Sequence, residues 1–137
     1  MVGSTLHFSL LKEGPSLTSF LTALQQRNLT ALELLFLNVS LGFNQGRLSY
    51  PSQAKIKQLA PLLKPFRISF HAPYEMSLTI EDRKKYTTSK RHFSTNLRLA
   101  HLLGASHITF HCGSVKHPGT YSLVKTRLQE IMALREQ

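Results

Sequence analysis

Apolar and polar positions along the chain follow two alternating periods, which predict a regular succession of strands and helices. Segments with period two are typical of half-buried strands, and segments with apolar residues three or four positions apart are typical of amphipathic helices. The predicted strands cover 5–11, 31–39, 67–71 and 107–111, and the predicted helices cover 16–27, 51–64, 79–104 and 121–137. This alternation predicts an α/β protein with a parallel sheet and right-handed crossovers.

A short phrase occurs twice, at the ends of the third and fourth predicted strands. Ile68-Ser69-Phe70-His71 leads into Ala72-Pro73-Tyr74, and Ile108-Thr109-Phe110-His111 leads into Cys112-Gly113-Ser114. In each copy the apolar residues face one side of the strand and the histidine faces the other. If both strands lie in one parallel sheet, the two histidines share a face at its carboxyl end, where α/β folds place their chemistry.

The chain of 137 residues is predicted to form one domain, 1–137, of four successive βα units. A parallel (β/α) TIM-type barrel of eight units needs roughly 250 residues, so we expect a half or truncated barrel. The last predicted helix ends without Gly, Pro or a following strand, which also favours truncation. The inward sheet positions are polar, which favours a barrel lumen with a charged site over a sheet covered on both faces. These positions are His7, Ser9, Glu33, Arg67, Ser69, His71, His107, Thr109 and His111.

Lysine and arginine number 17 against seven acidic residues, a formal net charge of +10 at pH 7. This excess favours an anionic partner such as nucleic acid, a phosphorylated sugar or a membrane surface, although a basic protein without such a partner is the alternative. The single cysteine excludes an internal disulfide framework. No apolar run is long enough to span a bilayer, and no signal peptide is evident. We therefore expect an intracellular protein, cytoplasmic or nucleoid-associated, with no membrane partner.

The two phrases and the text around them resemble endonuclease IV, the zinc-dependent apurinic/apyrimidinic endonucleases of the xylose-isomerase-like barrel superfamily. The resemblance rests on 71–74, Met76-Ser77-Leu78, the helix end at 100–105, and 110–114. It covers nearly the whole chain but only about the N-terminal half of a family member. It implies a DNA repair hydrolase acting on double-stranded DNA with abasic sites, in which clustered metal ions activate water for phosphodiester hydrolysis.

By this resemblance, His71 and His111 match two ligands of one zinc, and imidazole suits Zn²⁺. The alternative is that both are satisfied polar residues at strand ends. Tyr74 matches the tyrosine that the family uses at the abasic nucleotide; packing on its own barrel is the alternative. Asn44 and Arg47 resemble the family's recognition loop after the second strand, or else belong to a solvated turn.

Basic residues gather in the early turns of the third predicted helix, directly after the Tyr74 loop. We expect Lys84 and Lys85 at a DNA phosphate backbone, the alternative being a solvated outer face. The sequence also departs from the family, since Ser77 stands where it usually has Asn and Cys112 where it usually has Pro. We expect a buried thiol at Cys112, the alternative being a soft extra metal ligand.

The ligands that complete the family's metal cluster lie in its second half, so the zinc site is expected to be incomplete and the chain alone inactive. The resemblance leaves the catalytic residues of this chain unknown. A sugar-phosphate isomerase or epimerase of the same superfamily is one alternative, and a non-catalytic half-barrel interaction module is another. Open barrel edges predict self-association, because unpaired strand edges are unfavourable in a monomer.

Overall fold

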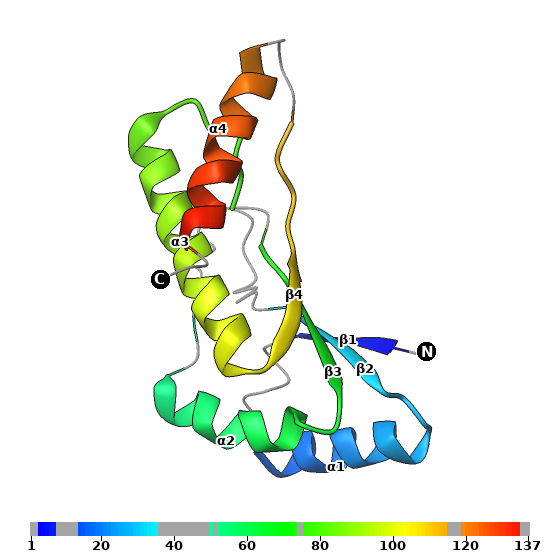
Figure 1. Ribbon diagram of the computed structural model, residues 1–137. Coiled ribbons are helices and arrows are strands. Elements are labelled where there is room, and N and C mark those ends of the chain that lie inside the picture. Colours follow the sequence, from blue (N-terminus) through cyan, green and yellow to red (C-terminus); the bar gives the residue numbers. More distant parts are fainter. Residues whose placement is uncertain are drawn as a thin grey trace, which may run out of the picture. The chain divides into compact units, whose positions relative to one another are not determined.

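The computed structural model describes residues 3–7, 14–35, 50, 52–73, 76–114 and 119–134. Strands and helices alternate along the chain, as the sequence predicts (Figure 1). The elements are β1 (Gly3–His7), α1 (Gly14–Gln26), β2 (Ala31–Leu35), α2 (Gln53–Leu63), β3 (Arg67–His71), α3 (Arg83–Leu102), β4 (Ala105–Thr109) and α4 (Gly119–Leu134). The predicted extensions of the first two strands, 8–11 and 36–39, lie outside the described residues.

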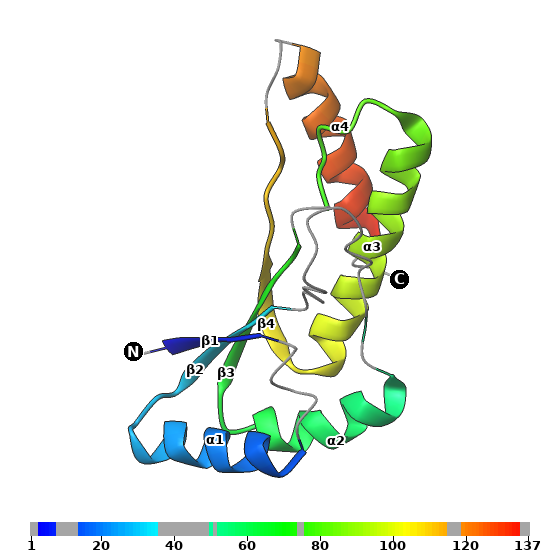
Figure 2. The ribbon, with the colours of Figure 1, turned by 180° about the vertical axis from the view of Figure 1, so that it is seen from behind.

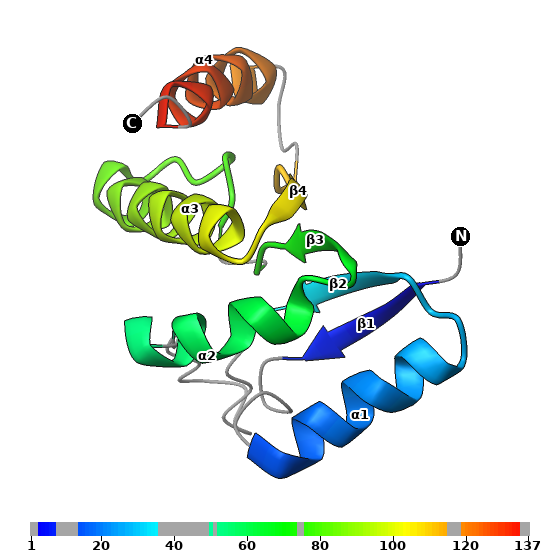
Figure 3. The same ribbon diagram turned by 60° about the horizontal axis from the view of Figure 1, so that its bottom comes forward.

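All four strands are parallel and lie in the order β1-β2-β3-β4. One row of the register pairs Thr5 with Glu33, Glu33 with Ser69, and Ser69 with His107. The helices α1 and α2 lie on the same side of this sheet (Figure 3). The predicted fold class is therefore confirmed, since the chain consists of four successive βα units of a parallel TIM-type barrel.

By contacts between Cα atoms the chain divides into two compact units. The first unit comprises Met1–His71 with Ala100–Thr109, and so holds the sheet, α1 and α2. The second comprises Ala72–Leu99 with Phe110–Gln137, and so holds most of α3 together with α4. Among the described helices, none has the length and apolar character needed to cross a membrane.

Apolar side chains of the first unit are buried between its helices and one face of its sheet. In β3, Ile68 and Phe70 are buried, whereas Arg67 is exposed and Ser69 and His71 are half-buried, so the predicted alternation is confirmed. Burial of this kind contributes about 25 cal/mol per Å² of apolar surface. The other buried apolar residues of β2, α1 and α2 are Leu32, Leu34, Leu17, Leu21, Leu24, Ile56, Leu59 and Leu63.

Several helix ends follow the predicted signals. Ser52 caps α2, since its side chain accepts a hydrogen bond from the Lys55 backbone N–H at 3.3 Å. Asn28 and Gly104, after α1 and α3, have positive φ angles of 59° and 73°. This left-handed conformation commonly ends a helix, so both predicted ends are confirmed.

The start of α3 differs from the prediction, which placed the N-cap at Thr79. The helix begins at Arg83, and the Asp82 carboxylate accepts a hydrogen bond from the Lys85 backbone N–H at 2.8 Å. Asp82 is therefore the capping residue. The Thr79 hydroxyl, which would have capped the helix, instead lies 3.0 Å from the Ser77 hydroxyl and forms a hydrogen bond with it.

Two further predictions are corrected, one at the end of β4 and one in α4, which lies beside α3 (Figure 2). The fourth strand ends at Thr109 rather than at His111, and the following Phe110 packs edge-on against Phe93, with ring centroids 5.1 Å apart. Leu128 of α4, predicted on its apolar face, is 38% exposed, whereas Arg127 is buried.

Candidate functional site

His71, the last residue of β3, lies beside a carboxylate from the neighbouring strand. Its Nδ1 is 3.2 Å from Oε1 of Glu33, and the two side chains are 26% and 33% exposed. The sheet register explains this contact: Glu33 pairs with Ser69, so His71 is the next residue of β3 on the same face. A half-buried histidine–carboxylate pair therefore occupies the carboxyl end of the sheet.

The contact assigns roles to the two ring nitrogens of His71. An ionised carboxylate only accepts hydrogen bonds, so the Nδ1 that faces Glu33 carries the hydrogen. In the neutral ring Nε2 then has the lone pair, and it is the atom that would bind a metal ion. Histidines that bind metals commonly have such a carboxylate partner, which fixes the tautomer and orients the ring. This arrangement suits His71 as one metal ligand.

His111, the other predicted ligand, belongs to the second unit and lies two residues beyond the end of β4. Joint zinc binding by the two histidines thus stays a prediction. Among the described residues, no group of three or more His, Cys, Asp or Glu side chains could hold a metal ion. A catalytic zinc usually has three protein ligands. The described donor set does not make a complete catalytic centre.

Three predicted DNA-binding residues, Asn44, Arg47 and Tyr74, lie outside the described residues. The chain on both sides of Tyr74 is well anchored. Ala72 is buried before it, Met76 and Leu78 are fully buried after it, and the Met76 backbone N–H donates to the Pro73 carbonyl at 3.0 Å.

The loops that follow the two strand-end phrases contact each other within the second unit. The Cys112 carbonyl accepts hydrogen bonds from the Leu78 backbone N–H at 2.9 Å and from the Ser77 hydroxyl at 3.3 Å. Gly113 has φ of +100°, and a Cβ atom there would overlap the hydroxyl oxygens of Ser77 and Thr79. Only glycine fits this close approach.

The prediction of a buried Cys112 is wrong, because its side chain is exposed. The residue lies beyond the end of β4, where the regular alternation between two sheet faces no longer holds. It is the Cys112 carbonyl that contacts the 77–78 segment.

Lys84 and Lys85 are exposed in the first turn of α3, as the prediction of a DNA-facing or solvated surface requires. Arg83 and Arg91 are exposed nearby. Lys90 differs, because its Nζ lies 2.9 Å from Oε2 of Glu130 on α4. The exposed lysines and arginines in the first half of α3 are Arg83, Lys84, Lys85 and Arg91, which together form the basic surface of α3. Lys90 is neutralised by its acidic partner.

Glu130 also accepts a hydrogen bond from the Tyr86 hydroxyl at 3.2 Å. Its hydrogen bond with Lys90 holds the pKa of the Glu130 carboxyl below its usual range. Burial, together with the Glu130 charge, raises the pKa of Tyr86 to about 12. No sequence pattern predicts the contacts among Tyr86, Lys90 and Glu130. Glu33, in contrast, belongs to the predicted polar face of the sheet, and its contact with His71 follows from the register.

No protein-family model matches the sequence, and no curated protein matches it significantly. Solved structures do. Endonuclease IV from Thermus thermophilus has a TM-score of 0.71 and 19% identity, with 98% of this chain and 47% of that one covered. D-psicose 3-epimerase with D-tagatose from Clostridium cellulolyticum H10 has a TM-score of 0.65 and 12% identity, with 98% and 49% covered. A putative sugar phosphate isomerase/epimerase from Anabaena variabilis ATCC 29413 has a TM-score of 0.57 and 8% identity, with 99% and 51% covered.

These likenesses show that the chain has the fold of part of a (β/α) TIM-type barrel. It spans about half the length of each of these structures. At such identities the likeness establishes the fold alone, and it includes both a nuclease and sugar epimerases.

Proposed function

We propose that this chain binds double-stranded DNA at abasic sites, as a protein of the endonuclease IV type. The observation that carries the proposal is the exposed basic surface of α3, which follows directly on the segment whose sequence resembles that family. The likeness to an endonuclease IV structure across 98% of the chain supports the same assignment.

The charge distribution on α3 supports a phosphate-binding role. Within the described part of the chain, the Lys84 and Lys85 side chains form no ion pair, so both charges are available to an external anion. Each phosphate that a protein neutralises releases counterions, which makes affinity for DNA depend steeply on salt. The formal net charge of +10 would strengthen the encounter with DNA at low ionic strength.

In this proposal Tyr74 inserts at the abasic nucleotide, Asn44 and Arg47 contact the DNA, and His71 and His111 bind zinc. A zinc ion bound there would supply Lewis acidity and an activated water. The chain's own contribution is to orient His71 through Glu33. Because the described donor set is incomplete, we propose DNA binding rather than cleavage for this chain.

Binding to a duplex with one abasic site, measured over a range of salt concentrations, tests the proposal. In the double variant Lys84→Gln/Lys85→Gln we expect the slope of log affinity against log salt to fall by up to about two units, since each phosphate contact contributes roughly 0.9. The matched control is Lys57→Gln/Lys64→Gln, which removes two exposed lysines associated with α2. We expect its slope to equal that of the wild type. Absent or salt-independent DNA binding would overturn the proposal.

A sugar-phosphate isomerase or epimerase is the second candidate function. The epimerase likeness, with a TM-score of 0.65, favours it, as does the half-buried Glu33–His71 pair, which could hold a proton or a metal beside a sugar. That function predicts a sugar phosphate whose binding is lost in His71→Ala, and no effect of Tyr74→Ala on a preference for abasic over intact duplex. The DNA proposal predicts no sugar-phosphate binding that depends on His71. It also predicts that Tyr74→Ala reduces the preference for abasic over intact duplex, because stacking on an aromatic ring is worth about 1–3 kcal/mol per base.

A further inference from the structure

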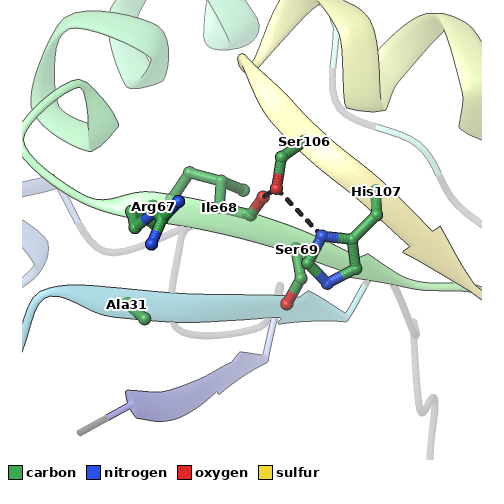
Figure 4. A pocket seen from close by; sticks show the side chains of 6 residues that line it. All are labelled: Ala31, Arg67, Ile68, Ser69, Ser106 and His107. Carbon is green, nitrogen blue, oxygen red and sulfur yellow. Dashed lines mark hydrogen bonds between the residues drawn. The ribbon is translucent and has the colours of Figure 1, made fainter. Parts of the chain in front are cut away.

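A pocket of about 320 Å³ lies at the amino end of β2, β3 and β4, in the first unit (Figure 4). Its position is distinct from the candidate site, because Arg67 in its lining is the first residue of β3 and His71 is the last. The volume is in the range of small-ligand sites, about 300–1,000 Å³. The lining residues are Ala31, Arg67, Ile68, Ser69, Ser106 and His107.

An irregularity in the sheet shapes this pocket. Ile68 pairs with Ala105 and Ser69 pairs with His107, so Ser106 is an extra residue in β4. The Ser106 hydroxyl turns to the Ile68 carbonyl at 3.2 Å and to Nδ1 of His107 at 2.9 Å. Figure 4 shows Ser106 and His107 together on β4, facing Ser69 on β3. Bulges of this kind re-aim side chains and are frequent beside functional sites.

The hydrogen bonds of Ser106 determine which ring nitrogen of His107 is left as an acceptor in the pocket. The Ser106 hydroxyl has one hydrogen, which it donates to the Ile68 carbonyl. Its oxygen must therefore accept the hydrogen bond from Nδ1–H of His107. In the neutral ring Nε2 is then a hydrogen-bond acceptor, and it suits a ligand hydroxyl.

Arg67 supplies hydrogen-bond donors and a positive charge to the pocket, whereas His107 supplies an acceptor. Its guanidinium is a fixed positive charge with only donor groups, which suits a phosphate or carboxylate. Within the described part of the chain Arg67 forms no ion pair, and no carboxylate lines the pocket. The acidic residue on the same sheet face, Glu33, lies against His71.

We propose that this pocket binds a small hydroxylated anion, such as a sugar or polyol phosphate, independently of the DNA-binding surface. Arg67 binds the anionic group, Nε2 of His107 accepts a hydrogen bond from a ligand hydroxyl, and Ala31 lies against the carbon skeleton. A ligand without charge lacks the Arg67 contact, and a ligand without a hydroxyl lacks the His107 contact.

The experiment is a titration of the isotope-labelled 137-residue protein with glycerol 3-phosphate, inorganic phosphate or glycerol, followed by amide chemical shifts. We expect shifts at 67–69 and 105–107. Glycerol 3-phosphate should bind about five- to tenfold more tightly than inorganic phosphate, the gain of one further hydrogen bond. Glycerol should cause no saturable shift.

Variants separate the two contacts. Arg67 is exposed, so Arg67→Gln should keep the fold while weakening both phosphate ligands about tenfold or more, as loss of a charge-assisted contact predicts. Arg27→Gln, an exposed arginine in the same unit, is the matched control and should bind as the wild type does. His107→Ala should lose the preference for glycerol 3-phosphate while still binding phosphate.

Equal affinities in Arg67→Gln and Arg27→Gln would overturn the proposal, as would shifts centred on 83–91. So would a loss of duplex DNA affinity in Arg67→Gln equal to that in Lys84→Gln/Lys85→Gln, because the pocket would then belong to the DNA surface. Binding that His71→Ala abolishes would assign the ligand to the carboxyl end of the sheet instead.

Discussion

The guanidinium carbon of Arg127 lies 3.7 Å from the centre of the Tyr86 ring. This cation–π contact joins α4 to α3, and the same guanidinium donates hydrogen bonds to the carbonyls of Leu78 and Ile80. A buried arginine therefore connects both helices to the chain segment that precedes α3. That segment follows the Tyr74 loop, so the contact supports the chain next to the proposed DNA surface.

Arg127→Met should lower the free energy of unfolding by about 2–4 kcal/mol, because the cation–π contact is lost and two carbonyls lose their donor. Unfolding in urea measures the difference. Arg91→Met removes an exposed arginine from α3 and is the matched control, for which we expect a change within about 0.5 kcal/mol. Equal effects of the two substitutions would contradict a structural role for Arg127.

Stability should fall at alkaline pH through ionisation of Tyr86. Its pKa is raised from 10.0 to about 12, chiefly by burial, so the unfolded chain loses this proton at a lower pH than the folded protein does. The stability that Tyr86 contributes by keeping its proton is therefore complete below pH 10 and is lost as the pH rises through about 12, with a total of roughly 3 kcal/mol. Tyr86→Phe should remove this part of the decline in urea titrations between about pH 9 and 12. Tyr121→Phe, which changes an exposed ring in the same unit, should not.

The two described glycines with positive φ should respond differently to alanine. Gly104, with φ of +73°, has open space where a side chain would lie, so Gly104→Ala should cost only the backbone strain of about 1–2 kcal/mol. Gly113→Ala should cost more, because its methyl group would also overlap the hydroxyls of Ser77 and Thr79. Urea unfolding of both variants measures the difference. Adding Ser77→Ala to Gly113→Ala should recover part of the loss, and no recovery would contradict the steric cause.

Zinc affinity should depend on the carboxylate beside His71 as well as on the predicted ligands. We expect weak binding by the wild type and loss of that binding in His71→Ala/His111→Ala. Glu33→Gln should weaken zinc binding by about tenfold or more, as the loss of a partner that orients a metal-binding histidine does. Titration against a competing chelator measures these affinities, and His101→Ala removes an exposed histidine as control. Equal affinity in the wild type and the double variant would show that zinc binds elsewhere.

The element order was predictable because each segment has a clear period and a clear end. The alternation of Ile68 and Phe70 with Ser69 and His71 follows from the pleat of any strand, and burial in β3 confirms it. The Glu33–His71 contact was within reach of the same reasoning, since both residues were assigned to one polar face. The sequence alone does not determine the register between β2 and β3, because this register depends on tertiary packing.

Three other features of the structure could not be predicted from the local sequence: the extra residue in β4, the burial of Arg127 and the start of α3. An extra residue at Ser106 changes no period visible in a strand of five residues. Arg127 is buried because a tyrosine ring and two carbonyls surround it, whereas charge alone predicts exposure. The N-cap prediction at Thr79 was wrong for a similar reason, because the Ser77 hydroxyl engages the Thr79 hydroxyl that would have capped the helix.

The order of the strands in the sheet is the order in which they leave the ribosome. Each strand pairs with the one synthesised just before it, so every pairing partner is already present when a new strand emerges. Domains and their parts commonly fold as the chain is made, N-terminal segments first. Growth of this sheet during translation therefore needs no strand to wait for a distant partner, and no earlier pairing has to open to admit a later one.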